Sequence, residues 1–173
     1  MTVNNNFSDI AYNRKSIRLY DESVKISNEE MLEMIQKSTI APSSVNMQPW
    51  RFVVVESPEE KQKLKPLIRF NTRQNDTSSA MILIFGDMEC YEYGEEIYNQ
   101  AVIEGKMSPQ VRDEQLAAII PYYKNLSREK MNDVVKIDSS LAAMQFMLVA
   151  RAHGYDTNPS GGFEADELAE AFG

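Results

Sequence analysis

The sequence predicts one domain in which helices are mixed with strands. The chain has 173 residues, of which 43% are hydrophobic, and this is enough to fill one hydrophobic core. Two short apolar runs, Phe52–Val55 and Ser79–Asp87, are typical of strands, and the second has no alternation, as in a strand that is buried on both faces. Most other segments carry apolar residues at helical spacing after recognisable helix starts.

Charge and cysteine content exclude several classes of protein. The chain carries 26 acidic and 18 basic residues, and it has no basic face of the kind that nucleic acid requires. Cys90 is the only cysteine and His153 the only histidine, so an intrachain disulfide and a thiolate cluster are excluded and no metal site is expected. The N-terminus is unlike a signal peptide, and no apolar run approaches the ~18 residues of a membrane span. We expect a cytoplasmic protein with neither nucleic acid nor a membrane as a partner.

Helix starts recur along the chain. Ser27 and Glu30 form a capping box, in which the serine caps the helix and the glutamate stands at its third position. Further expected caps are Ser8, Ser57 and Ser108. The helix that begins at Ser108 is expected to kink or end at Pro121, and a last short helix is expected over 164–172.

The longest helical candidate runs from Ser127 to His153, and Gly154 is expected to end it. From Val134 on, apolar residues fall on nearly every face, which is the pattern of a buried helix. Because a chain of this length covers such a helix poorly by itself, we expect a homodimer. His153 is expected to compensate the helix dipole or to have a structural role.

A basic segment, Arg14–Arg18, lies near the N-terminus. In an extended backbone, Arg14, Ser16 and Arg18 project to one side and Lys15 to the other. Two guanidinium groups that flank a hydroxyl suit a phosphate, because arginine offers paired donors and stays charged. A solvated basic patch is the alternative.

Two loops carry more polar groups or bare backbone than a turn needs. In the segment Pro42–Trp50, Pro49 removes a backbone donor and excludes Gln48 from a helix. The hydrogen-bonding side chains of this segment include Ser43, Ser44 and Asn46. In the segment Pro159–Phe163, paired glycines allow another group to approach the backbone closely. An ordinary polar loop and a flexible loop are the respective alternatives.

Taken in order, these motifs resemble the FMN-dependent nitroreductase family. The match runs from about Asn13 to the end of the chain. The motifs that carry it are Arg14-x-Ser16-x-Arg18, Pro42-Ser43-Ser44-x-Asn46-x-Gln48-Pro49-Trp50, Asn71-x-x-Gln74 and Pro159-x-Gly161-Gly162-Phe163. The resemblance implies an α+β fold with a central β-sheet packed among helices, in an intertwined homodimer with two identical FMN sites at the subunit interface.

The resemblance also implies a role for each motif. The residues that would hold the FMN phosphate and ribityl chain are Arg14, Lys15, Ser16 and Arg18. Those that would approach the flavin from the partner subunit are Ser43, Ser44 and Asn46. Those that would bond the pyrimidine edge of the ring are Asn71 and Gln74. Those that would lie against the ring, with one glycine N–H near flavin N5, are Pro159, Gly161 and Gly162.

The implied activity is that of an oxidoreductase that takes hydride from NADH or NADPH. It would reduce a small-molecule acceptor, such as a nitroaromatic or a quinone, in a ping-pong cycle. Because the flavin carries the electrons, no side chain is expected to act as a catalytic acid, base or nucleophile. Two alternatives are a family member with a dedicated reductive substrate and a protein that binds or sequesters flavin without turnover.

The chain departs from the family pattern at two places. Gln74 stands where some relatives carry a lysine, and a neutral amide stabilises the charge of reduced flavin less than an ammonium does, so we expect a lower reduction potential. The family continues into another strand and a C-terminal arm whose basic residues help to hold the phosphate, whereas this chain ends at Gly173. We therefore expect one domain, 1–173, without these parts: either the sequence is incomplete, or Arg14 and Arg18 hold FMN weakly.

Overall fold

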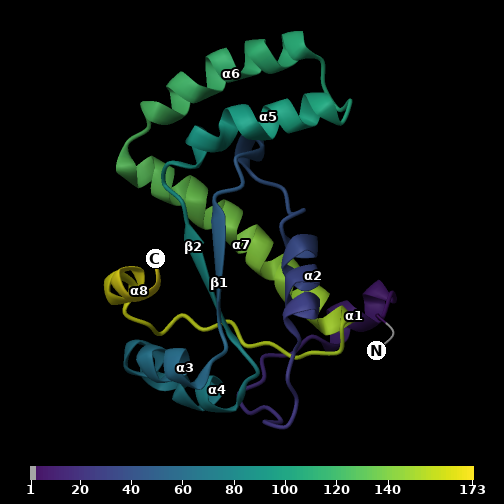
Figure 1. Cartoon of the computed structure of the whole chain (residues 1–173), viewed down its shortest axis with the longest axis vertical. Coiled ribbons are helices and arrows are strands. Elements are labelled where there is room, and N and C mark those ends of the chain that lie inside the picture. Colours follow the sequence, from purple (N-terminus) through teal and green to yellow (C-terminus); the bar gives the residue numbers. More distant parts are fainter. Residues whose placement is uncertain (1–2) are drawn as a thin grey trace. The chain divides into compact units, whose positions relative to one another are not determined.

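A computed structural model describes residues 3–173 and contains mostly helices and one two-stranded sheet (Figure 1). Its elements, with η for a 3-10 helix, are α1 (Phe7–Asn13), α2 (Asn28–Ser38), η1 (Ser44–Asn46), β1 (Trp50–Val55), α3 (Pro58–Leu64), η2 (Lys65–Leu67), η3 (Arg69–Asn71), α4 (Thr72–Thr77), β2 (Met81–Gly86), η4 (Cys90–Tyr93), α5 (Gly94–Ile103), α6 (Pro109–Lys124), α7 (Arg128–Ala152) and α8 (Ala165–Phe172). The predicted α+β class is confirmed.

The sheet consists of β1 and β2, both of which the apolar runs predict. The N–H of Asp87, just after β2, donates to the C=O of Pro49, just before β1, at 2.7 Å. The start of one strand therefore pairs with the end of the other, and the sheet is antiparallel. Met81–Phe85 of β2 are half-buried rather than fully buried, and each strand has a single neighbour within residues 3–173, which leaves one edge of the strand open.

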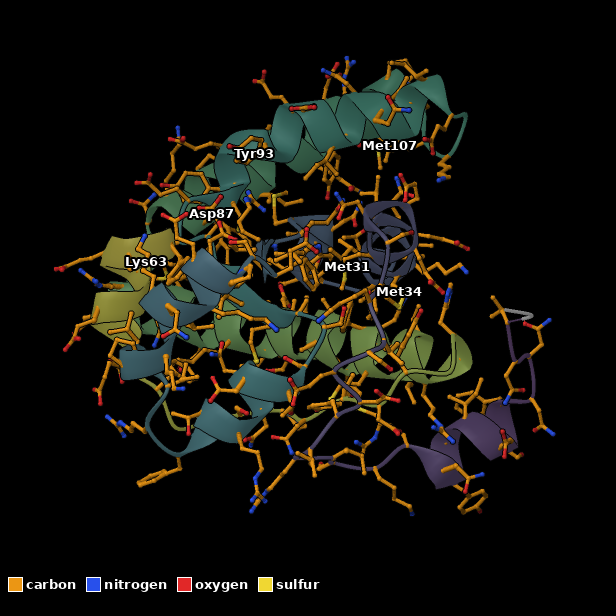
Figure 2. The ribbon with its side chains drawn as sticks, turned by 60° about the horizontal axis from the view of Figure 1, so that its bottom comes forward. Met31, Met34, Lys63, Asp87, Tyr93 and Met107 are labelled. Carbon is orange, nitrogen blue, oxygen red and sulfur yellow. The ribbon has the colours of Figure 1, made fainter. Side chains whose placement is uncertain are left out.

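Two compact units divide the chain, and the first contains the segments up to Ile40, Phe52–Phe85 and Ala143–Gly173. Helices cover both faces of its strands. The even-numbered residues Phe52 and Val54 pack with Met31 and Met34 of α2, which are labelled in Figure 2. The odd-numbered Val53 and Val55 belong instead to a cluster with Leu64 of α3 and Leu168 of α8. Because alternate residues of a strand face opposite sides, this unit buries a central sheet between helices.

The second unit contains Ala41–Arg51 and Gly86–Ala142. Its helices α5 and α6 lie side by side (Figure 1). Its buried cluster consists of Met47, Cys90, Tyr98, Tyr123, Met131 and Val135. Burial raises the pKa of Cys90 to about 11, so this cysteine stays a thiol at neutral pH.

Most of the predicted helix starts are confirmed. One N-cap and one helix end differ from the prediction. The hydroxyls of Ser27, Ser57 and Ser108 accept backbone N–H groups as N-caps. The cap of α1 is Asn6 rather than Ser8, because the Asn6 side chain accepts the Asp9 N–H. Helix α6 does not end at Pro121; it continues to Lys124, where the side chain of Asn125 donates to the Pro121 carbonyl at 2.7 Å and closes the last turn.

Helix α7 confirms the longest predicted helix, and Gly154, with φ of 92°, follows it as a left-handed C-terminal residue. It is not covered on all sides by this chain. One stripe is buried at helical spacing and comprises Met131, Val135, Asp138, Ala142, Phe146 and Ala150. Another stripe, with Ile137, Leu141 and Met144, leaves 63%, 43% and 42% of these residues exposed.

His153 has a structural role at the end of α7. It is buried, and its ring nitrogens lie 3.1 Å from the Glu30 carboxylate and 3.1 Å from the Lys37 ammonium. These contacts tie the end of α7 to α2 and explain why Glu30 does not complete the capping box with its side chain. Among the helices of the described chain, none is long and apolar enough to cross a membrane.

Candidate functional site

The basic segment and the glycine-containing segment meet in the first unit. Ser16 and Thr157 form an isolated parallel bridge, and the Ile17 N–H donates to the Thr157 carbonyl at 3.1 Å. The backbone around Ser16 is therefore extended, as predicted, because a bridge requires it. This pairing brings the Arg14–Arg18 segment beside the start of the segment 157–162.

A buried donor of Arg14 lacks a partner at this junction. The Nη1 atom of Arg14 is buried and has no hydrogen-bond partner among residues 3–173, and the same holds for Oγ1 of Thr157. A buried donor of this kind is rare in a native protein unless another group satisfies it. The side chains of Lys15, Ser16 and Arg18 are exposed. Arg14 is the residue of this segment whose environment most clearly calls for an anionic acceptor.

The predicted amides form one connected network with the glycine segment. Asn71 Nδ2 donates to the carbonyl of Gly162 at 2.9 Å and to that of Ile68 at 3.0 Å. The buried Gln74 donates through Nε2 to Asn71 Oδ1 at 3.2 Å and to Asn158 Oδ1 at 3.5 Å. Asn71 and Gln74 are one turn apart at the start and middle of α4, so the network holds the 158–162 segment against this helix.

The glycines themselves need no special conformation, since neither has a positive φ. A Cβ atom at Gly162 would lie 3.5 Å from Asn71 Nδ2, which is ordinary contact. At Gly161 a Cβ would meet no heavy atom of the described chain within 4 Å, and both Gly161 and Pro159 are exposed. The chain alone therefore does not require glycine here, and close approach of a ligand to this backbone stays a prediction.

The loop Ser43–Gln48 of the second unit has a strained backbone. Its φ angles are positive at Val45 (44°), Asn46 (59°) and Gln48 (47°). Asparagine tolerates this region, but a β-branched valine is an outlier there, and each such residue costs on the order of 1–3 kcal/mol. Such strain persists only where surrounding groups hold the chain in place.

Groups of α5, α6 and α7 hold the first half of the Ser43–Gln48 loop. The carboxylate of Asp138 accepts the Ser44 N–H at 2.9 Å. The Tyr123 hydroxyl donates to Ser44 Oγ at 2.7 Å, and the Tyr98 hydroxyl donates to the Val45 carbonyl at 3.1 Å. Burial raises the pKa of both tyrosines, so they remain protonated donors.

Arg51 holds the second half of the same loop. Its Nη1 donates to the carbonyl of Gln48 at 3.0 Å, and its Nη2 pairs with Asp87 at 2.6 Å. The guanidinium also lies 5.0 Å from the centre of the Tyr93 ring, and Figure 2 shows Asp87 and Tyr93 at neighbouring positions. The carbonyls of two of the residues with positive φ, Val45 and Gln48, therefore each accept a hydrogen bond from a side chain outside the loop.

The motifs did not predict these supporting residues: Arg51, Tyr98, Tyr123 and Asp138. One signal was present for Asp138, since an acidic residue stands in the buried stripe of α7, between Val135 and Ala142. The predicted site residues fall into two groups, one in each unit. Arg14, Ser16, Asn71, Gln74 and the 158–162 segment belong to the first, and Ser43, Ser44 and Asn46 belong to the second.

Comparisons with known proteins agree on one family. The model of the nitroreductase family matches residues 11–173. YdgI of Bacillus subtilis, which bears the provisional name NAD(P)H nitroreductase, is 51% identical over 173 residues, covering 100% of this chain and 83% of the relative. The CLA biosynthesis enone reductase of Lactiplantibacillus plantarum is 37% identical over 99% of this chain and 79% of its own length.

A solved structure supports the same assignment. A provisionally assigned nitroreductase from Exiguobacterium sibiricum, determined in complex with FMN, is 53% identical and superposes with a TM-score of 0.95. The match covers 98% of this chain and 80% of that chain. A match of this extent, in sequence and in fold, is far beyond chance resemblance, and the chain belongs to the nitroreductase family.

Proposed function

We propose that this chain is an FMN-dependent oxidoreductase that takes hydride from NADH or NADPH and reduces a small-molecule acceptor. Its relatives support this, since YdgI is named for NAD(P)H nitroreductase activity and the Exiguobacterium protein holds FMN. The observation that carries the proposal is the buried, unpartnered Nη1 of Arg14, which lies on the segment that Ser16 joins to Thr157. An FMN phosphate would supply the anionic acceptor that this donor lacks.

The residues of this chain fit FMN by their donor and acceptor types. Arg14 and Arg18, with Lys15 and Ser16, would bind the phosphate. Asn71 and Gln74 would serve the pyrimidine edge, because amides offer both donors and acceptors. The backbone at Pro159, Gly161 and Gly162 would lie against the ring. The loop with Ser43, Ser44 and Asn46 would approach the flavin from the other subunit of a homodimer.

Bound FMN would supply the hydride chemistry in both halves of a ping-pong cycle. The chain would bind the flavin, orient it and leave one of its faces accessible. Gln74 is buried and its Nε2 is already bonded to neutral oxygens of Asn71 and Asn158, so it would bring no positive charge to the ring. Nitroaromatics and quinones are the proposed acceptors.

We further propose that the active form is a homodimer. The exposed stripe of α7 gives Ile137 and Leu141 no cover within the second unit, although each is a large apolar residue. A second copy of the chain would bury this stripe. L141E should give a monomer in light scattering after gel filtration, whereas K136E, an exposed change on the same helix, should leave a dimer. Dimeric L141E would overturn the assignment of this stripe to the interface.

A dedicated reductive substrate is a second candidate. The 37% identical relative from Lactiplantibacillus plantarum is named as an enone reductase of CLA biosynthesis. An α,β-unsaturated ketone accepts hydride at carbon, so it would use the same reduced flavin with a different acceptor.

Anaerobic spectroscopy tests the proposal. Purified protein reconstituted with FMN should be yellow, should bleach with NADH or NADPH, and should recover its colour with a nitroaromatic, a quinone or an enone. The acceptor that restores the colour fastest identifies the substrate class. A protein that does not bind FMN would refute the proposal, and one that stays yellow with both nicotinamides would instead be a flavin-binding protein without turnover.

A further inference from the structure

The Ser43–Gln48 loop combines a strained backbone with hydrogen bonds to groups outside it. Within it, the N–H groups of Asn46, Met47 and Gln48 donate to Ser43 and Ser44 at 3.0–3.1 Å. Despite these bonds, the backbone lies in the left-handed region at Val45 and Asn46. Such residues return to favoured conformations unless other groups prevent it. The groups that prevent it are therefore part of whatever this loop does.

Asp138 is the acidic residue among these groups, and burying it costs free energy of folding. It is 5% exposed and lies in the buried stripe of α7, where its neighbours along the stripe are Val135 and Ala142. Burial raises the pKa of its carboxyl, because the charged form loses solvation there, so a charge at this position lowers the stability of the fold. An apolar residue at this position would make a more stable core. Among residues 3–173, the group that the carboxylate bonds is the Ser44 N–H.

Two tyrosines bond further groups of Ser44 and Val45. Tyr123 donates to Ser44 Oγ, so the oxygen of this serine is engaged as an acceptor and its own proton stays available to a ligand. Tyr98 donates to the Val45 carbonyl and fixes the peptide that follows the valine. Asp138 accepts the Ser44 N–H, so Asp138 and Tyr123 together fix both the backbone and the hydroxyl group of Ser44.

We propose that Asp138 is a positioning residue for the flavin: it acts through the Ser44 N–H to hold the Ser43–Gln48 loop, before FMN arrives, in the shape that binds it. This inference rests on the proposed function, because it takes FMN as the ligand of the loop. Holding the loop in advance removes the ordering cost that binding would otherwise include. Loss of the carboxylate should therefore weaken FMN binding without any lost contact to FMN.

Two measurements on purified full-length variants test this. Hydrogen exchange of the amides of residues 43–48 is followed in flavin-free protein, and the Kd for FMN is measured by quenching of flavin fluorescence. D138A removes the acceptor, and D138N keeps its shape with a neutral, weaker acceptor. E129A is the matched control, since Glu129 is an exposed acid in the first turn of the same helix. Thermal unfolding confirms that each variant is folded, and Y123F replaces D138A should that variant fail to fold.

D138A should accelerate exchange at Ser44 and raise the Kd for FMN about tenfold, D138N should do both to a smaller extent, and E129A should match the natural protein. Unchanged exchange in D138A and D138N would overturn the inference. Faster exchange with an unchanged Kd would also overturn it, because the hold on the loop would then not serve flavin. A natural protein that binds no FMN would refute the proposed function instead, while the exchange data would still decide whether Asp138 holds the loop.

Discussion

Replacing Asn71 by alanine should loosen the glycine segment and weaken flavin binding together. The change removes two hydrogen bonds from Nδ2, to Gly162 at 2.9 Å and Ile68 at 3.0 Å, and the acceptor of the 3.2 Å bond from Gln74. A typical hydrogen bond contributes about 0.5–1.5 kcal/mol net. The Ile68 bond is local and Asn71 is only half-buried, so water replaces part of the loss, and we expect N71A to lower the free energy of unfolding by about 2 kcal/mol.

Denaturant unfolding of the flavin-free protein measures this directly, and a Kd for FMN measures the consequence for binding. For a chain of this length, about 2 kcal/mol corresponds to a fall in thermal midpoint of roughly 4–8 °C. N71D is the informative companion. It keeps the oxygen that Gln74 reaches but places a second oxygen against the carbonyls of Gly162 and Ile68, where a donor stood.

At neutral pH, N71D should therefore be at least as unstable as N71A, and it should recover as the pH falls, because a protonated carboxyl can donate again. The reasoning is refuted if N71A keeps the unfolding midpoint and the FMN affinity of the natural protein. It is equally refuted if N71D is as stable as the natural protein at pH 7, since the network would then not depend on the Nδ2 donor.

Three further changes test other parts of the site. Q74K should raise the potential of the bound flavin in spectroelectrochemical titration, because an ammonium favours reduced flavin, and no rise would count against this. R14Q should weaken FMN more than riboflavin, and more than R18Q does, because Arg14 has the buried donor and Arg18 is exposed. A bond from the Tyr155 hydroxyl holds the pKa of Glu30 below 4.5, so it stabilises the fold above pH 4.5 and is lost as the pH falls through the lowered pKa; Y155F should lower the thermal midpoint at pH 7, and by less as the pH falls below the lowered pKa of Glu30.

Features with a local cause could be predicted from the sequence. The caps at Ser27, Ser57 and Ser108 depend on residues three positions apart, and the structure confirms each of them. The two apolar runs became β1 and β2 for the same reason, since strand preference is contained in the run itself. The spaced motifs also indicated which segments carry the site, although not how those segments would meet.

Features with a distant cause could not be predicted. No local preference places a valine at φ of 44°, so the shape at Val45 depends on groups outside the loop. The bond from Ser44 to Asp138 spans 94 residues, and that from Asn71 to Gly162 spans 91. The end of α6 had a nearer cause: the side chain of Asn125 donates to the Pro121 carbonyl in the last turn, and a rule based on proline alone does not consider this partner.

The two halves of the predicted site keep their shape by different means, and this bears on how the family's chemistry is tuned. The network of Asn71, Gln74 and the 158–162 segment bonds to itself, so its shape is a property of the site residues. The Ser43–Gln48 loop is strained and depends on Asp138 and Arg51, which need not touch the flavin. Local preference is violated here and the compensation lies elsewhere, as expected of a functional segment. We therefore expect substitutions in the helices that hold this loop to alter flavin binding while every residue of the binding motifs stays the same.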